Sequence, residues 1–189
     1  MQELPSVGSY ARPMSLPIAV GLRAETSADE DVLYRLAAEL ATFEERSPAP
    51  PAPLTLATYR SRREKGEGGD DAAFVITLDD EPVGRCQIFG EDRLARNAEI
   101  GIALLPEARG RGVGTEALRQ LVEFAFVRRN LHRLHLRAIN SNAAGLAAYR
   151  KVGFVEEGRH REHCWVRGRY EDEVTMGLLR SEWQAARRS

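Results

Sequence analysis

The sequence predicts a mixed α/β domain in which helices flank a central sheet. Segments with apolar residues at alternate positions interchange along the chain with segments that have helical spacing. A strand, a Gly-rich loop, an amphipathic helix and another strand follow one another between residues 98 and 138, and no internal repeat is present. The 189 residues fit one domain, which we expect over 18–189 after a Pro/Ser/Gly-rich leader over 1–17.

The expected elements follow from local patterns. Thr26 or Ser27 can cap a first helix, Pro residues exclude helix and central strand over 47–53, and Gly153 can end a helix in a left-handed conformation. In chain order we expect a strand over 18–23, a helix over 29–42, the Pro-rich loop, a helix over 55–65, strands over 73–78, 83–89 and 98–105, a helix over 115–128, a strand over 134–138, a helix from Asn142 to Gly153, and strands over 154–165 and 170–179.

Charge and composition disfavour two classes of binding partner, nucleic acid and membranes, and indicate a reducing compartment. The formal net charge is −1, so the whole-protein field does not attract nucleic acid, and we expect no nucleic-acid partner. No apolar run approaches the roughly 20 residues that a membrane helix needs, so we expect no membrane partner. Two cysteines far apart in sequence favour a reducing compartment, and a cytoplasmic location is the expectation.

The densest chemical pattern is Arg109-Gly110-Arg111-Gly112-Val113-Gly114-Thr115, between a strand and a helix. Glycines let backbone N–H groups surround an anion, and a helix N-terminus adds further donors and partial positive charge. The pattern lacks the Gly-Lys-Ser/Thr ending of a Walker loop and the third glycine of a dinucleotide loop. It favours a pyrophosphate site, with a solvated turn as the alternative.

A second segment runs from Asn142 through Tyr149 to Gly153 and Phe154. Seven helical residues at about 100° each return to nearly the same face, so Asn142 and Tyr149 are predicted to point the same way. A helix cap for Asn142 and a core position for Tyr149 are the alternatives.

Together, Arg109-x-x-Gly112-x-Gly114 and the Asn…Tyr-x-x-x-Gly-Phe segment resemble the GNAT acetyltransferases, over roughly residues 73–183. The resemblance implies a GNAT fold of six or seven strands, splayed between the fourth and fifth, and acetyl-CoA as co-substrate. It implies that the pantetheine arm lies in the splay against backbone groups of Ile102, Ala103 and Leu104. The implied cofactor-binding residues are Ile102, Ala103, Leu104, Arg109, Gly110, Arg111, Gly112, Val113, Gly114, Thr115, Asn142 and Tyr149.

The same resemblance implies two catalytic residues. The Tyr149 hydroxyl would return a proton to the thiolate. Glu99 matches a position that several members use as general base, and a solvated carboxylate is the alternative. The tail from Gly153 is most similar to the branch of ribosomal-protein N-terminal and spermidine acetyltransferases.

We therefore expect direct transfer of an acetyl group from acetyl-CoA to an amine on a protein N-terminus, a polyamine or a small molecule. The alternative is a non-catalytic acyl-CoA-binding sensor or scaffold. The first helix, the Pro-rich loop and the final hairpin are expected to form the acceptor pocket. A homodimer is expected by family analogy only.

The histidines are interpreted as solvated rather than as metal ligands. On a regular strand His160 and His163 face opposite sides, and the same spacing separates His132 from His135. We expect no metal.

Overall fold

The computed structural model describes residues 19–40, 51–65 and 72–188. Its seven strands form one sheet in the order β1-β2-β3-β4-β5-β7-β6. The strands are β1 (Val20–Arg23), β2 (Ala72–Leu78), β3 (Glu81–Asp92), β4 (Asn97–Leu104), β5 (Arg133–Ile139), β6 (Val155–Val166) and β7 (Arg169–Leu179). The predicted leader and residues 47–50 of the predicted Pro-rich loop lie outside the described residues.

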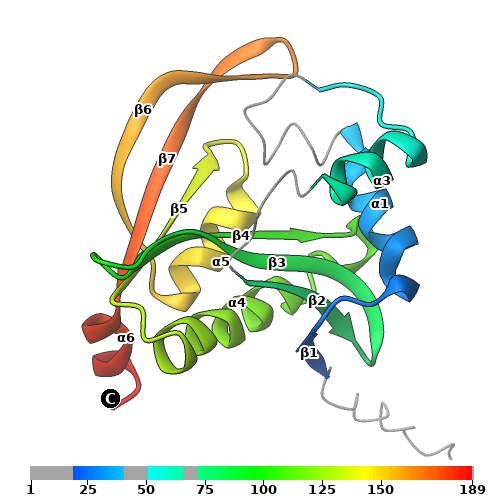
Figure 1. Cartoon of the computed structure of the whole chain (residues 1–189). Coiled ribbons are helices and arrows are strands. Elements are labelled where there is room, and N and C mark those ends of the chain that lie inside the picture. Colours follow the sequence, from blue (N-terminus) through cyan, green and yellow to red (C-terminus); the bar gives the residue numbers. More distant parts are fainter. Residues whose placement is uncertain (1–18, 41–50, 66–71, 189) are drawn as a thin grey trace, which may run out of the picture.

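The helices lie on both faces of the sheet (Figure 1). The α-helices are α1 (Glu30–Ala38), α3 (Leu56–Glu64), α4 (Val113–Glu123), α5 (Ala143–Val152) and α6 (Arg180–Ala186), and shorter turns of helix are η1 (Ser27–Asp29), η2 (Pro106–Ala108) and η3 (Phe124–Arg128). The side chains of α4 and α5 pack on one face, and those of α1 and α3 on the other. None of the described helices is long and apolar enough to cross a membrane.

The predicted elements are present with small shifts at their ends. Helix α4 begins at Val113, two residues earlier than predicted, because Gly112 takes the left-handed conformation at φ +84° and serves as the N-cap. The predicted continuation of this helix to Arg128 is a π-helical turn, η3. Gly153 ends α5 at φ +112°, as predicted.

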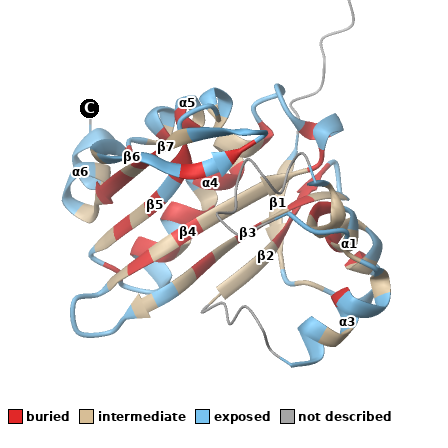
Figure 2. Ribbon diagram, turned by 90° about the horizontal axis from the view of Figure 1, so that it is seen from above, coloured by how far each residue is buried: buried red, intermediate tan, exposed pale blue. Residues whose placement is uncertain are grey.

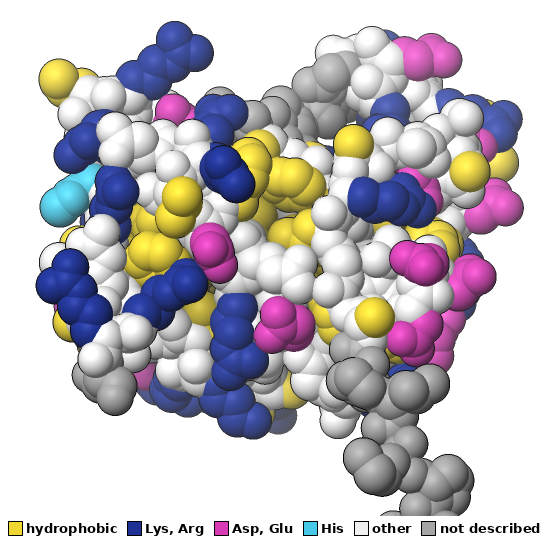
Figure 3. Space-filling model, turned by 90° about the horizontal axis from the view of Figure 1, so that it is seen from below, with side chains coloured by type: hydrophobic (Ala, Val, Ile, Leu, Met, Phe, Trp, Pro, Cys, Tyr) yellow, Lys and Arg dark blue, Asp and Glu magenta, His cyan; other side chains and the backbone are white. Residues whose placement is uncertain are grey.

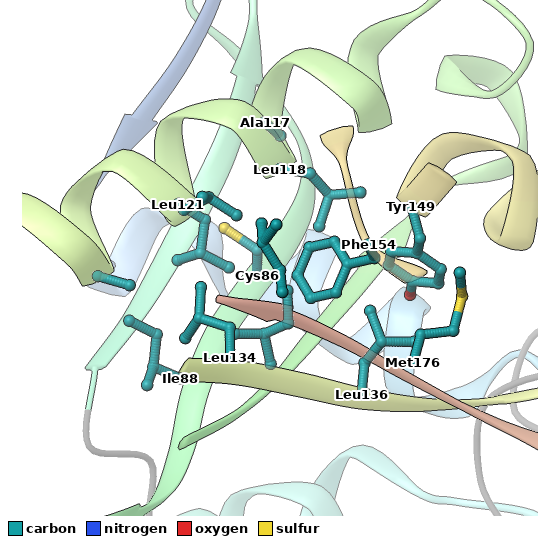
Figure 4. Close-up of a cluster of buried hydrophobic side chains, with 14 of the residues drawn as sticks. Cys86, Ile88, Ala117, Leu118, Leu121, Leu134, Leu136, Tyr149, Phe154 and Met176 are labelled. Carbon is teal, nitrogen blue, oxygen red and sulfur yellow. The ribbon is translucent and has the colours of Figure 1, made fainter. Parts of the chain in front are cut away.

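One large core lies between the sheet and the helices α4 and α5. Amphipathic spacing puts Leu118, Leu121 and Val122 on the sheet side of α4, where each is 1 % exposed or less. Figure 2 shows buried segments along the central strands β3, β4 and β5 as well. At one end of the cluster the ring of Tyr149 lies beside Phe154 and Met176 (Figure 4), with the two ring centroids 6.0 Å apart.

A buried carboxylate joins β1 to α1 on the opposite face. Asp29, 1 % exposed, accepts hydrogen bonds from Arg23 Nη1 and Nη2 at 2.7 and 2.6 Å and from the backbone N–H of Thr26 at 2.8 Å. These donors favour the charged carboxylate, and the Arg23 guanidinium, the largest cause, holds the pKa of Asp29 well below its usual range. The contact therefore ties Arg23, at the end of β1, to Asp29, at the start of α1.

Asp29→Asn is expected to lower the melting temperature at pH 7 by several degrees, because it removes the charge that these donors stabilise. A carboxyl whose folded pKa is lowered stabilises the fold above its unfolded pKa of about 3.9 and loses that contribution as pH falls further. The difference between wild type and variant should therefore shrink below about pH 4. Thermal unfolding at pH 7 and pH 3 measures both effects, with Asp31→Asn, an exposed neighbour on α1, as the control. A constant difference at both pH values would contradict this account.

Candidate active site

The parallel strands β4 and β5 are paired over only three residues each. Asn97, Ala98 and Glu99 pair with Arg133, Leu134 and His135, and beyond Glu99 the two strands separate. On its other side β4 stays paired with β3 as far as Leu104, and β5 with β7 as far as Ile139. The sheet is therefore splayed between its fourth and fifth strands, as the resemblance implied.

The gap leaves a row of backbone groups on β4 without a neighbouring strand. The N–H of Leu105 bonds to the carbonyl of Val83 on the β3 side, and bonding direction alternates along an antiparallel ladder. The backbone groups of Ile102 and Leu104 therefore point into the gap, whereas those of Ala103 point to Arg85, its partner on β3. The prediction that Ala103 offers free backbone groups is wrong for this reason.

The loop after β4 has the geometry of an anion site. Gly110 and Gly112 have φ of +71° and +84°, and a Cβ at either position would meet nothing within 4 Å. The first backbone bond of α4 runs from Glu116 N–H to the carbonyl of Gly112, and no side chain caps this end. The N–H groups of residues 113–115 are therefore left for another acceptor.

A cleft of about 410 Å³ runs from this loop to the gap, between α4 and α5, and we call it the α4–α5 cleft. It is lined by Ile102, Ala103, Leu104, Arg109, Gly110, Gly112, Gly114, Thr115, Leu118, Asn142, Ala144, Gly145, Ala147, Ala148, Tyr149 and Lys151. Ten of the twelve predicted cofactor-binding residues line this cleft. Lys151 was not predicted, although Ala144, Ala148 and Lys151 have the spacing of one helical face.

Three residues of the predicted loop differ from expectation. The Arg109 guanidinium donates to the carbonyl of Leu104 from Nε at 3.0 Å and Nη2 at 2.9 Å, so it fastens the loop to the end of β4. Arg111 is exposed and does not line the cleft. Val113 is 1 % exposed and packs in the core, so it can offer only its backbone N–H.

Asn142 and Tyr149 face the same way, as their spacing predicts, and both line the α4–α5 cleft. The Asn142 side chain also accepts from Gly145 N–H at 3.0 Å, so it caps α5. Tyr149 is 7 % exposed, and burial raises the pKa of its hydroxyl to about 12. Asn142 is therefore both a helix cap and a residue of the cleft lining. Tyr149 is both a core residue and a residue of the cleft lining.

A second cleft, of about 380 Å³, opens on the other face of the sheet, and we call it the α1–α3 cleft. It is lined by Leu33, Leu36, Ala37, Tyr59, Arg63, Arg85, Gln87, Phe89, Glu99, Ile100, Gly101, Ile102, Ala103, Arg137, Ala138, Asn142 and Tyr149. The first helix, α1, forms one wall, and α3 and β3 supply others. None of the described residues of the final hairpin, which was expected to help form the acceptor pocket, lines this cleft.

The two clefts meet at the gap. Ile102, Ala103, Asn142 and Tyr149 line both of them. Because each cleft lies on a different face of the sheet, a molecule in one can touch a molecule in the other only where β4 and β5 separate.

Glu99 lies at the start of the gap, in the last pair of the β4–β5 ladder. Arg137 lies two residues beyond His135, the last residue of β5 that pairs with β4. It donates to the Glu99 carboxylate from Nε at 3.1 Å. His135 Nε2 is 3.9 Å from the same carboxylate, and burial lowers the pKa of His135. The Arg137 contact was not predicted, although strand alternation puts His135 and Arg137 on one face.

The α1–α3 cleft is mainly cationic among its described residues. Its charged lining groups are Glu99 and the guanidinium groups of Arg63, Arg85 and Arg137. Arg63 also pairs with Glu25 outside the cleft wall, and Arg137 pairs with Glu99. Figure 3 shows that the opposite side of the molecule carries both signs of charge interspersed.

The histidines of β6 do not behave as predicted. A register shift between His160 and Cys164 puts His160 and His163 on the same side of the strand, with ring centroids 5.2 Å apart. With Glu173 they form the one group in the described part of the chain that could hold a metal ion. The assumption of a regular strand is therefore wrong here, whereas His132 and His135 belong to no such group.

The chain is similar in sequence to known acetyltransferases. The chain is 33% identical over 109 residues to YdaF of Bacillus subtilis (strain 168), a protein named as a ribosomal N-acetyltransferase, covering 58% of this chain and 60% of the relative. It is 29% identical over 112 residues to spermidine N(1)-acetyltransferase of Escherichia coli (strain K12), covering 59% and 60%. The chain thus spans about 60% of the length of these relatives.

A solved structure, that of Mycobacterium smegmatis RimJ in complex with CoA-disulfide, superposes with a TM-score of 0.74 at 26% identity, covering 86% of this chain and 83% of that one. The family model for the acetyltransferase (GNAT) domain matches residues 20–155, which include the gap, the loop and α5. The chain therefore belongs to the GNAT acetyltransferase domain family.

Proposed function

We propose that this protein transfers an acetyl group from acetyl-CoA to an amine. The observation that carries the proposal is the meeting of two clefts at the gap between β4 and β5, where they share four residues. The α4–α5 cleft would hold the cofactor, with the pyrophosphate on the loop over 109–115 and the pantetheine arm against Ile102 and Leu104. The amine would enter through the α1–α3 cleft.

The proposed reaction needs no covalent enzyme intermediate. The neutral amine nitrogen attacks the thioester carbon, the C–S bond breaks, and the amine loses a proton while the thiolate gains one. A backbone N–H in the gap would donate to the carbonyl oxygen as negative charge develops. Burial raises the pKa of Cys86 to about 12, so this thiol stays protonated near pH 7 and is a poor nucleophile.

Tyr149 is proposed as the acid. With a pKa of about 12, its hydroxyl carries its proton throughout the neutral range, and it lines both clefts. Glu99 is proposed as the base for the acceptor amine. Its carboxylate lies at the start of the gap, where Arg137 Nε donates to it at 3.1 Å. An α-amino acceptor loses its proton more readily than a side-chain amine and therefore demands less of this base.

Tyr149→Phe is expected to lower kcat by roughly 10²–10⁴, the usual range for the loss of a positioned acid. The Kd of acetyl-CoA should change much less, because the ring remains. Thiol release over a panel of amines measures kcat, and calorimetric titration of acetyl-CoA measures the Kd. Tyr170→Phe, an exposed tyrosine on β7, is the control.

Two results would contradict this assignment. A kcat within about twofold of wild type, with chemistry rate-limiting, would leave Tyr149 a packing residue. Tight acetyl-CoA binding without thiol release for any amine would favour the sensor or scaffold alternative.

For the acceptor, we propose an amine that carries an anionic group near it, such as an amino acid or an acidic peptide N-terminus. Among the described lining residues, three guanidinium groups face one carboxylate, and Arg63 and Arg137 are also paired with Glu25 and Glu99. The lining therefore offers more hydrogen-bond donors to a carboxylate than acceptors to a polycation. A polyamine acceptor, suggested by the spermidine relative, is the competing hypothesis. A cytoplasmic location, a homodimer and a single domain over 18–189 remain predictions from the sequence.

Arg63→Gln is expected to raise KM for the preferred anionic acceptor about 10- to 100-fold, because a hydrogen bond to a charged group contributes about 1.5–3 kcal/mol. The kcat should stay near wild type. Steady-state kinetics with glutamate, an Asp-initiated peptide and spermidine test this, with Arg62→Gln, exposed on the same helix and outside the cleft wall, as the matched control. If spermidine is the best acceptor, or if Arg63→Gln improves its use without affecting anionic amines, the acceptor proposal fails.

A further inference from the structure

Two imidazoles and a carboxylate converge on the outer hairpin of the sheet, outside both clefts. His160 Nδ1 lies 3.2 Å from Glu173 Oε2, and His163 Nε2 lies 3.9 Å from the same oxygen. One ligand atom from each residue lies within 4.8 Å of the other two. Glu173 is 5 % exposed, whereas the two histidine side chains are half-exposed.

The backbone holds the two histidines together through an irregular strand. His160 pairs with Glu173 and Cys164 with Glu171, so three residues of β6 lie opposite a single residue of β7. Within this bulge Glu162 has a φ of +49°, in a region that residues other than glycine rarely occupy. Its N–H donates to Asp172 Oδ1 at 3.0 Å, which fastens the strained residue to β7.

The bulge has a specific consequence for His163. A regular strand would direct His163 away from His160, and the irregular backbone instead turns both rings towards Glu173. Bulges and strained residues are frequent at functional sites. Here the strained residue Glu162 lies in the bulge that brings three potential metal ligands together.

The shorter of the two histidine contacts, between His160 Nδ1 and Glu173 Oε2 at 3.2 Å, is a hydrogen bond. The 3.9 Å between His163 Nε2 and Glu173 Oε2 is too long for a hydrogen bond, so His163 gains none from this carboxylate. Two ligand atoms bound at 2.0–2.1 Å in a tetrahedral site lie roughly 3.3 Å apart, which a small rotation of the His163 side chain can reach. Arg137 Nη1, at 4.0 Å from Glu173 Oε1, approaches the other carboxylate oxygen and leaves Oε2 to the histidines.

We propose that His160, His163 and Glu173 bind a divalent transition-metal ion of the zinc class. Imidazole nitrogen and carboxylate oxygen are ligands that such ions accept, and the exposed side of the cluster leaves a fourth position for water or another ligand. The site is separated from Glu99 by one side chain, since Arg137 contacts Glu99 at 3.1 Å and approaches Glu173 at 4.0 Å. The proposal does not depend on acetyl transfer.

The test is calorimetric titration of the full chain, made without an affinity tag, with zinc chloride. We expect saturable one-to-one binding by wild type and a Kd raised at least about tenfold in His163→Ala, because loss of a ligand should cost no less than loss of an outer-shell partner. His132→Ala, which removes an exposed histidine outside the cluster, should leave the Kd unchanged. Cobalt(II) gives a second readout, since tetrahedral coordination produces visible absorption that His163→Ala should remove.

His163 is exposed, so His163→Ala should keep the wild-type circular dichroism and remain informative even if substitution of buried Glu173 prevents folding. No saturable zinc binding by wild type would overturn the proposal. Equal affinity of wild type and His163→Ala would overturn it too, as would a loss in His132→Ala as large as that in His163→Ala.

Discussion

The candidate site exists because β4 pairs with β5 over only three residues. A continuous sheet would separate the α4–α5 cleft from the α1–α3 cleft, because a paired ladder leaves no room between strands. The ladder ends at Glu99 and His135, and beyond it only side chains and backbone edges line the opening. Each strand keeps its other neighbour, β3 or β7, so the gap does not require either strand to unfold.

The elements around the gap each contribute one property. Gly112 starts α4 in a left-handed conformation, which leaves the first N–H groups of the helix for an anion. The Arg109 guanidinium holds the loop against the end of β4 by donating to the Leu104 carbonyl. Tyr149 reaches the gap from α5, packed against Phe154, and its buried hydroxyl remains protonated at neutral pH. The buried Asp29 fixes α1, which walls the opposite cleft.

Local patterns predicted the features that depend on local chemistry. The Gly-rich loop, the shared face of Asn142 and Tyr149, and the cap at Gly153 follow from glycine geometry and helical spacing. The charged lining of the α1–α3 cleft was not predictable in this way, because Arg63, Arg85 and Arg137 come from three elements whose meeting is decided by the sheet order. The bulge at Glu162 was missed because alternation assumes a regular strand, and no glycine marks the irregular position.

We propose that the acyl-CoA arm lies in the gap between β4 and β5 and extends the sheet as an added strand on β4. Hydrogen exchange of individual β4 amides, measured by NMR with and without acetyl-CoA, tests it most directly. The amides of Ile102 and Leu104, which point into the gap, should gain protection from exchange when acetyl-CoA binds. The amides of Gly101 and Ala103, which point to β3, should change little. Unchanged exchange at Ile102 and Leu104 with acetyl-CoA bound, or equal changes at all four amides, would show that the arm does not pair with β4.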